Sequence, residues 1–220
     1  MIVKNVFIIG HGDEAKITAD LINDKDTMKL CGYFEVHNDQ IDYYSNNDLK
    51  IKNIDFNKYI NLNNYFCIGI GYNYDRFKVY EKLKQFNNIQ WTSIISDTAK
   101  IRSGAIIGEG CIIHDNVYIN RRTVIGNHCI INNNTSIDHD CVMENFSSTG
   151  PAVVTGGRIK IGKLSYVGID SVVLQNIQIG QSTVIGAKSL VNKNCDSYSL
   201  YFGITSKFIK NIPEDFNYFK

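Results

Sequence analysis

A repeat of six residues runs from Ile101 to Cys195 and limits the possible folds more than any other feature of the chain. Every sixth residue from Ile101 is Ile or Val at thirteen of sixteen positions, and the exceptions are Met143, Thr149 and Thr155. A period of six fits neither an α-helix nor a single strand, so it indicates a repeat architecture. The pattern predicts a parallel β-helix, in which three hexads form one triangular turn and residues eighteen apart stack.

Small residues recur at the fifth position of the hexads. The large aliphatic residue at the first position points into a narrow prism, and only a small side chain fits beside it. Gly or Asn often follows the first position, where we expect it to tolerate an unusual corner backbone. Four of the six cysteines occupy fifth positions, so we interpret them as small buried hydrophobes and predict a reducing, cytoplasmic location: Cys111, Cys129, Cys141 and Cys195.

Composition excludes several classes of protein. The formal net charge is +1 and no basic block occurs, which argues against nucleic acid as a partner. No run of eighteen apolar residues is present, so we expect no membrane span. A length of 220 residues is enough for two domains.

The first ninety residues alternate between strand and helix patterns. We predict strands at 3–9, 30–34 and 65–71, and helices at 13–21 and 76–86. This order predicts a small parallel α/β sheet, whose ligand lies at the carboxyl ends of the strands. The candidate binding residues there are Gly10, Gly12, Glu35, Gly71 and Asn73. The Gly-x-Gly pair is equally explained as a tight turn between strand and helix.

We divide the chain into an α/β domain at 1–90, a β-helix at 95–205 and a tail at 206–220. Residues 87–100 link the first two parts, and Trp91, Ile94 and Ile95 are expected at the join. The pattern at 198–204 predicts a last strand. The tail is compatible with a short helix that covers the open end of the prism.

His139 is the strongest candidate for a chemical role. It occupies the third position of its hexad, near a corner, where side chains point outward; His114 and His128 also lie in the repeat, where a lone histidine is more often a surface corner residue. Asp140 follows it, and Gly157 stacks one turn above, leaving space beside the imidazole and offering an amide donor. A base, an acid that orients it and an amide donor are the parts that acyl transfer needs. The histidine spacing does not match a zinc site, so we expect no metal.

The chain resembles bacterial sugar acyltransferases of the PglD and NeuD type, which pair a small Rossmann-like domain with a left-handed β-helix. The resemblance extends from residue 8 to residue 203. It is carried by residues 131–132, Ser-Ile-Asp-His-Asp-Cys at 136–141, Gly-Gly-Arg-Ile-Lys-Ile-Gly at 156–162, Val-Gly-Ile-Asp-Ser at 167–171, and residues 203–207.

The resemblance implies a role for each matching residue. His139 is the general base, Asp140 holds its ring, the Gly157 amide faces the thioester carbonyl, and Asn132 lies near the reacting group of the sugar. Acetyl-CoA lies in a groove between neighbouring prisms of a homotrimer. Its expected contacts are Gly157, Gly168, Gly186, Ala187, Gly203, Ile204 and Lys207. The α/β domain holds the nucleotide of a nucleotide-linked amino sugar.

The sequence departs from the family pattern at three places. Asp13 and Glu14 replace a glycine and a histidine in the loop after the first strand. Ser148 stands where some members have a second histidine, and Thr-Ser at 205–206 replaces Pro-Ala. The first change bears on how the nucleotide is held.

Three functions follow from these observations. The first is N-acetylation of an amino group on a nucleotide-linked deoxy sugar, in the synthesis of a bacterial surface glycan. The second is O-acetylation of a sugar hydroxyl, which a His-Asp pair also serves. The third is an inactive binding scaffold, favoured by the altered loop and opposed by the intact set of Asn132, His139, Asp140 and Gly157.

Overall fold

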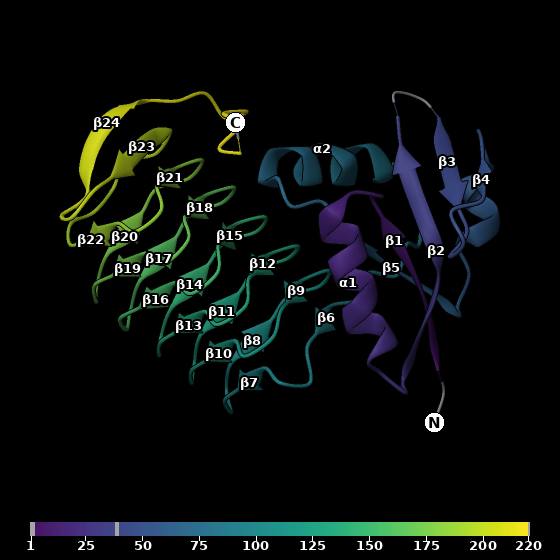
Figure 1. Ribbon diagram of the computed structural model, residues 1–220, viewed down its shortest axis with the longest axis horizontal. Helices are drawn as coiled ribbons and strands as arrows, with labels where there is room; N and C mark the ends of the chain where they lie inside the picture. Colours follow the sequence, from purple (N-terminus) through teal and green to yellow (C-terminus); the bar gives the residue numbers. More distant parts are fainter. Residues whose placement is uncertain (1–2, 38–39, 220) are drawn as a thin grey trace.

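The computed structural model describes residues 3–37 and 40–219. It contains an α/β unit and a left-handed parallel β-helix that lie side by side, with helix α2 extending across the corners of the β-helix (Figure 1). The fold class predicted from the hexad repeat and from the strand–helix alternation is therefore confirmed.

Three parallel strands form the centre of the α/β unit: β1 (Lys4–Ile9), β2 (Met28–Val36) and β5 (Asn64–Ile68). The helices are α1 (Asp13–Asn23) and α2 (Asn73–Leu83). All five elements lie where the sequence predicts them, with ends shifted by a few residues. β1 pairs with both other strands and is almost fully buried, which explains its unbroken apolar run.

The sheet also contains two antiparallel strands that the sequence did not reveal. Strands β3 (Ile41–Tyr44) and β4 (Lys50–Ile51) extend the sheet to the order β4-β3-β2-β1-β5, and a 3-10 turn (Phe56–Tyr59) follows. The prediction of an all-parallel sheet is therefore wrong at this edge. These edge strands are short, partly exposed and rich in polar residues, so they lack the apolar run on which the other assignments rested.

The β-helix is built from strands of two residues, stacked in three parallel sheets. The sheet that faces the α/β unit, here called the docked sheet, contains β6 (Ile94–Ile95), β9 (Ile112–Ile113), β12 (Ile130–Ile131), β15 (Ser148–Thr149), β18 (Tyr166–Val167) and β21 (Val184–Ile185). The second sheet contains β7 (Lys100–Ile101), β10 (Tyr118–Ile119), β13 (Ser136–Ile137), β16 (Val154–Thr155), β19 (Val172–Val173) and β22 (Leu190–Val191). The third contains β8 (Ile106–Ile107), β11 (Val124–Ile125), β14 (Val142–Met143), β17 (Lys160–Ile161) and β20 (Gln178–Ile179).

The β-helix starts with Ile94 and Ile95, which were expected at the join between the two units. They form its first strand, β6, which pairs with β9. The register is constant among the two-residue strands, each of which pairs with a strand eighteen residues away, as in Ile119 with Ile137.

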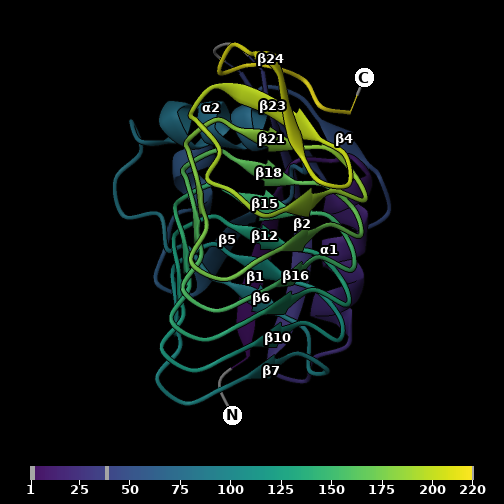
Figure 2. The same ribbon diagram turned by 90° about the vertical axis from the view of Figure 1, so that its left-hand side faces the viewer.

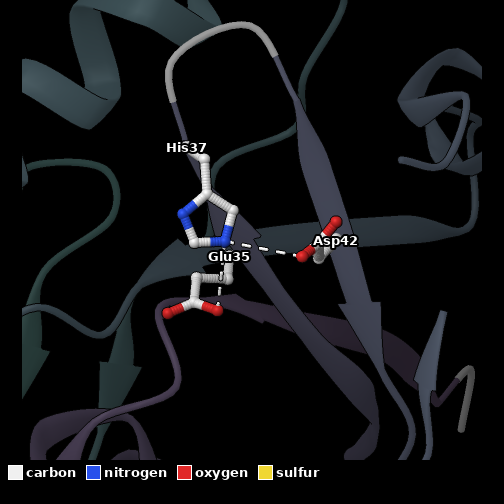
Figure 3. A group of neighbouring side chains, drawn as sticks. All are labelled: Glu35, His37 and Asp42. Atoms are coloured by element: carbon white, nitrogen blue, oxygen red, sulfur yellow. Dashed lines mark ion pairs between the residues drawn. The ribbon is translucent and has the colours of Figure 1, made fainter. Parts of the chain in front are cut away.

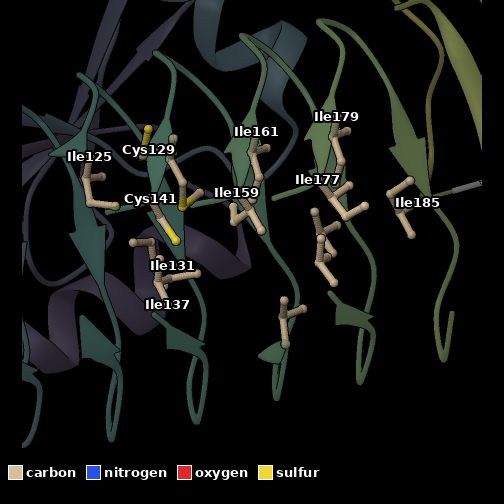
Figure 4. Packing of buried hydrophobic residues seen from close by; sticks show 14 of the residues in the cluster. Ile125, Cys129, Ile131, Ile137, Cys141, Ile159, Ile161, Ile177, Ile179 and Ile185 are labelled. Carbon is tan, nitrogen blue, oxygen red and sulfur yellow. The ribbon is translucent and has the colours of Figure 1, made fainter. Parts of the chain in front are cut away.

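Aliphatic first-position residues fill the prism, as predicted (Figure 4). The expectation that only small side chains fit at the fifth position is wrong at four hexads, where a larger aliphatic residue is buried in the same core: Val117, Val153, Ile159 and Ile177. All six cysteines are unpaired thiols. The four fifth-position cysteines are at most 5% exposed, which confirms their interpretation as core residues.

Glycine at the corners has a different cause from the one expected. The left-handed backbone falls on the fourth position of each hexad, for example at Arg122 (φ 56°) and Asp140 (φ 58°). The glycines at second positions are instead required by the close approach of the next turn. A Cβ atom on Gly162 would lie 2.5 Å from the main chain of Gly180.

The two units share an apolar core. Ala15, Ala19 and Ile22 of α1 pack in one cluster with Ile112 and Ile130, which point outward from the docked sheet. Helix α2 adds polar contacts further along the same sheet. These contacts fix the α/β unit against the prism.

Arg76 of α2 is fully buried at this junction. Its guanidinium donates to the carbonyl oxygens of His128 and Phe146 on the prism, and to those of Ile70 and Gly71 in the loop before α2. It therefore joins the two units through carbonyl groups, which are expensive to leave unpaired once buried.

The end of the chain closes one end of the prism and returns to the junction. Strands β23 (Ser199–Phe202) and β24 (Lys207–Asn211) form an antiparallel hairpin that extends the docked sheet beyond β21 (Figure 2). The tail is thus a strand and turns, where a short helix was considered. Beyond it, Tyr218 stacks on Tyr166 with ring centroids 4.1 Å apart, and its hydroxyl accepts from the Asn73 N–H.

Candidate active site

His139 lies on the corner that follows β13, between Asp138 and Asp140. Its Nδ1 lies 2.6 Å from Asp140 Oδ2, so the predicted pair of base and orienting acid is present. The imidazole side chain is 35% exposed, which leaves it accessible from outside the prism. The left-handed backbone of Asp140 turns its carboxylate back toward the ring.

Arg122, stacked one turn before Asp140, fixes this carboxylate. Its Nε lies 2.5 Å from Asp140 Oδ1 and its Nη2 lies 2.9 Å from Oδ2. The Arg122 guanidinium, followed by the His139 ring, holds the pKa of the Asp140 carboxyl well below its usual range. Sequence reasoning missed Arg122, although its spacing of eighteen from Asp140 was a signal that could have found it.

Asp138 is held still more completely. Its Oδ1 accepts from the N–H of His139 and from Asn120 Nδ2, both at 2.7 Å. Its main-chain carbonyl accepts from Thr123 Oγ1 at 2.6 Å, and its N–H donates to Thr155 Oγ1 at 3.1 Å. The residue before His139 therefore has few alternative positions.

Gly157 stacks against the His139 ring, as its position one turn above predicted. A Cβ atom on Gly157 would lie 2.7 Å from both Cε1 and Nε2 of His139. Only glycine leaves room for the imidazole in its observed place. Among the described residues, none accepts a hydrogen bond from the Gly157 N–H.

Cys141 is the cysteine nearest to this corner, but it points into the prism. Its side chain is fully buried, and burial raises the pKa of its thiol. A buried, protonated thiol is a poor nucleophile, which disfavours an acyl-cysteine intermediate.

Asn132 does not join His139 within one chain. It follows β12 of the docked sheet, whereas His139 follows β13 of the second sheet, so they lie on neighbouring corners of the same turn. The Asn132 side chain accepts from the Asn133 N–H, and the main-chain N–H of Asn132 donates to Thr149 Oγ1 at 3.3 Å.

Three of the residues predicted to contact acetyl-CoA lie in the corner column of Asn132. Gly168 follows β18, and Gly186 and Ala187 follow β21. Close stacking already explains both glycines, because a Cβ on Gly168 would meet the Ala187 N at 2.6 Å and one on Gly186 would meet Phe202 at 2.7 Å. Gly203 (φ 109°) ends β23; Ile204 is 82% exposed, and Lys207 begins the exposed strand β24.

The α/β unit has a cleft of about 350 Å³ at the carboxyl ends of its parallel strands. Gly10 and Glu35, both predicted, line it. Lys78 and Lys82 of α2 line the opposite side, together with Asp75, His11 and His37. The lysines were missed because only the structure shows which face of α2 borders the cleft. Gly12 begins α1 nearby, with open space around its Cα.

Glu35, His37 and Asp42 lie close together beside this cleft (Figure 3). Their ligand atoms lie within 4.8 Å of one another, a spacing compatible with a metal ion. However, Lys50 Nζ lies 2.9 Å from Asp42 Oδ2 and 3.8 Å from Glu35 Oε2, and so supplies the positive charge. The Asn53 N–H and Lys50 together hold the pKa of Asp42 below its usual value. We interpret the group as an ion-pair cluster.

Asn73 and Gly71 have roles other than those expected. The Asn73 side chain is buried at the junction, donates to the carbonyls of Leu164 and Ser165, and accepts from Arg76 and Ser148. Its hydrogen-bonding capacity is therefore used within the chain, which contradicts a role in substrate binding. Gly71 lies beside it, near Glu14 and Phe219, and not in the lining of the cleft.

The unusual Glu14 also belongs to the junction. Its Oε1 lies 3.0 Å from Nε2 of His114 on the corner after β9, and both side chains are largely buried. The departure from the family pattern at this position therefore adds a contact between α1 and the prism. It does not line the cleft.

The chain thus belongs to a class defined by two units: a small α/β domain with a ligand cleft, and a β-helix with an exposed His-Asp pair. Residues 5–83 match the family model of the PglD N-terminal domain. None of the helices in residues 3–37 and 40–219 is long and apolar enough to cross a membrane.

Solved structures share the whole fold. A histidine-to-alanine variant of GDP-perosamine N-acetyltransferase from Caulobacter crescentus, in complex with CoA and GDP-perosamine, has a TM-score of 0.82 and 21% identity, over 95% of this chain and 98% of that one. The acetyltransferase domain of PglB from Neisseria gonorrhoeae, in complex with acetyl coenzyme A, has a TM-score of 0.81 and 20% identity, over 94% and 100%.

A chloramphenicol acetyltransferase from Klebsiella aerogenes is 37% identical over 65 residues. The match covers 30% of this chain and 31% of that relative. The domain family and the shared fold confirm the resemblance to PglD-type proteins that the sequence indicates.

Proposed function

We propose that this protein transfers acetyl from acetyl-CoA to the amino group of a nucleotide-linked amino-deoxy sugar, in the synthesis of a bacterial surface glycan. The observation that carries the proposal is the His139–Asp140 pair, 2.6 Å apart and accessible, with Gly157 stacked on the ring. The solved structures with this fold support it, because they include a sugar N-acetyltransferase with CoA and its nucleotide sugar.

His139 acts as the general base. Because Nδ1–H donates to the anchored Asp140 carboxylate, Nε2 carries the free lone pair. It removes a proton from the amine as the amine nitrogen attacks the thioester carbonyl, and Asp140 stabilises the imidazolium that forms. Such proton transfer typically contributes about 10²–10⁴-fold to the rate.

The Gly157 N–H stabilises the oxyanion of the tetrahedral intermediate. A donor of this kind typically contributes about 10²–10³-fold. Collapse of the intermediate breaks the carbon–sulfur bond, and the imidazolium returns its proton to the CoA thiolate. The products are the N-acetyl sugar and free CoA thiol, and no acyl-enzyme is formed.

The cleft of the α/β domain holds the nucleotide. Gly10, Gly12 and Glu35 border or adjoin it, and Lys78 and Lys82 provide the cations that a diphosphate requires. Asp13 and Glu14 in the first turn of α1 oppose phosphate binding at that helix terminus. Lys78 and Lys82 of α2 therefore bind the anion in place of the N-terminus of α1.

Acetyl-CoA and the sugar meet between two copies of the chain in a homotrimer. Within a single chain, the column of Asn132, Gly168, Gly186 and Ala187 lies on a different corner from His139. A neighbouring copy is therefore needed to bring the two columns together. The second and third sheets support this assembly, because they expose aliphatic side chains: Val154 and Val172, and Ile106, Val124 and Val142. Gly203, Ile204 and Lys207 border the far end of the acetyl-CoA groove.

The unpaired, buried cysteines support a reducing compartment, and we propose the bacterial cytoplasm, where nucleotide sugars and acetyl-CoA are available.

Thiol release from acetyl-CoA in the presence of nucleotide-linked 3- and 4-amino sugars tests the proposal. We expect His139→Ala to lose most of the turnover, while light scattering still gives a trimer and calorimetry still gives acetyl-CoA binding. Turnover at the wild-type rate by His139→Ala would rule out His139 as the base.

A further inference from the structure

Two threonines interrupt the aliphatic first positions of the hexads, at Thr149 and Thr155. Both are buried, with 1% and 5% exposure. Their hydroxyls therefore lie where all the other first positions of the repeat place a methyl group or a thioether. Each threonine lies one turn above the residue that precedes a corner with a candidate site residue: Thr149 pairs with Ile131, directly before Asn132, and Thr155 follows Val154, which pairs with Ser136 before the His139 corner.

The hydrogen bonds at these two corners differ from those at the others. The residue after each two-residue strand normally donates its N–H to a main-chain carbonyl one turn on, as Asn120 does to Ile137 and Gly156 to Val173. In the described part of the chain, Asn132 and Asp138 are the two such residues whose N–H donates to a side chain. The acceptors are Thr149 Oγ1 and Thr155 Oγ1.

The strand pairing changes at Thr155 as well. Neighbouring strands of the second sheet pair through two residues, as β10 does with β13 and β16 with β19. Between β13 and β16 a single pair remains, Ser136 with Val154. The main-chain ladder is therefore interrupted directly before His139, and the Thr155 hydroxyl bridges the interruption.

We infer that Thr155 is a positioning residue for His139, and that Thr149 acts in the same way on the Asn132 corner. The inference rests on the proposed function. Thr155 and Thr123 hold the Asp138 peptide from the turns on either side, through its N–H and its carbonyl oxygen. The Asp138 carboxylate then accepts from the main-chain N–H of His139 and so fixes the backbone from which the imidazole extends.

A threonine serves here because its shape fits a first position while its hydroxyl accepts a hydrogen bond. Valine has the same shape and would restore the repeat, but it leaves the Asp138 N–H without this acceptor. The corner must then bury an unpaired N–H or move until the N–H reaches a main-chain carbonyl. Movement of the corner displaces His139, and a displacement near 1 Å costs on the order of 10²-fold in rate.

The experiment compares Thr155→Val and Thr155→Ser by steady-state kinetics. We expect Thr155→Val to lower kcat by about tenfold or more, with the KM for acetyl-CoA within about twofold of wild type. Thr155→Ser keeps the hydroxyl and should restore kcat to within about threefold. Thr155→Ala replaces the valine variant in the same comparison if the latter does not fold.

Thr183→Val is the matched control. Thr183, like Thr155, is a buried threonine with a hydrogen bond to the main chain, but its hydroxyl donates to the Asp196 carbonyl and it lies further along the prism from His139. We expect it to lower the melting temperature and to leave kcat near the wild-type value. A purely structural role for Thr155 predicts that the two valine variants behave alike.

A measurement that needs no turnover separates this inference from the proposed function. The short bond between His139 Nδ1–H and Asp140 should give a low-field proton NMR signal, assigned by its loss in His139→Ala. We expect the signal to shift or disappear in Thr155→Val and to persist in Thr155→Ser and Thr183→Val. An unchanged signal and unchanged kcat in Thr155→Val would overturn the inference, as would a Thr155→Ser variant as impaired as Thr155→Val.

Discussion

Substitution of Gly157 by alanine displaces the His139 ring while leaving the backbone conformation permissible. The added Cβ atom would lie 2.7 Å from Cε1 and from Nε2 of the imidazole. Gly157 is not among the glycines with positive φ, so alanine introduces no left-handed strain. The perturbation therefore acts on the ring.

The size of the effect follows from the contact distance. Carbon atoms in ordinary van der Waals contact lie about 3.5–4.0 Å apart, so the ring must move by about 0.8 Å or more. Asp140, itself held by Arg122, prevents the ring from moving without loss of the 2.6 Å bond to Nδ1. A displacement of this size predicts a decrease in kcat of about 10–100-fold, equivalent to about 1.4–2.7 kcal/mol in the activation free energy.

The assay is thiol release at saturating acetyl-CoA, with melting temperatures measured in parallel. Gly162→Ala serves as the control, because its Cβ would meet the main chain of Gly180 at 2.5 Å, on a corner away from His139. We expect the control to lose stability and keep kcat, and Gly157→Ala to keep stability and lose kcat. Full turnover by Gly157→Ala would refute the tight stacking on which the assignment of the pair rests.

Two further predictions concern the junction and the cleft. Burial among aromatic rings lowers the pKa of His128 to about 3, so as pH falls below about 6.5 the unfolded chain binds a proton at His128 before the folded chain does, and the free energy of unfolding falls by up to about 1.4 kcal/mol per pH unit down to pH 3. Urea unfolding at pH 7, 6 and 5 should show this slope. His128→Phe, chosen because Phe146 occupies the same position one turn on, should reduce the slope, and an equal slope in both proteins would contradict the prediction. The double change of Lys78 and Lys82 to Gln should weaken calorimetric binding of GDP, UDP or dTDP by about tenfold or more, with no such loss for Lys58→Gln outside the cleft; equal affinities would remove the lysines from the site.

The hexad repeat predicted much of the β-helix and its site because stacking at a fixed spacing converts sequence distance into spatial distance. Gly157 could be assigned to His139 in this way, and the same arithmetic applied to Arg122 and Asp140 would have found the guanidinium. The buried cysteines were predictable for the same reason, since fifth-position side chains point into the prism.

Other features depended on contacts that no local pattern records. The β3–β4 edge and the tail strand β24 are short and polar or exposed, so their strand conformation comes from pairing and not from an apolar run. Asn73 follows a strand end, which suggested a ligand, but docking of α2 onto the prism buries its side chain. Similarly, Glu14 contacts His114 because the α/β unit lies against the docked sheet.

The threonine breaks illustrate the intermediate case. The sequence marks Thr149 and Thr155 as exceptions to the repeat, and it places them near the candidate site. Only the structure shows that their hydroxyls accept the N–H groups of Asn132 and Asp138. A break in a strict pattern located the feature, and hydrogen-bond partners gave its physical meaning.

Product analysis is the decisive test of acetyl transfer to an amine. The purified protein is incubated with acetyl-CoA and a panel of UDP-, dTDP- and GDP-linked 3- and 4-amino sugars. The masses of the products are then measured by mass spectrometry before and after hydroxylamine treatment. We predict that one member of the panel gains a single acetyl group that resists hydroxylamine, as an amide does, and that His139→Ala forms almost none of it. A product that hydroxylamine cleaves would indicate an ester and an O-acetyltransferase, and no product with any acceptor would contradict the proposed acetyl transfer.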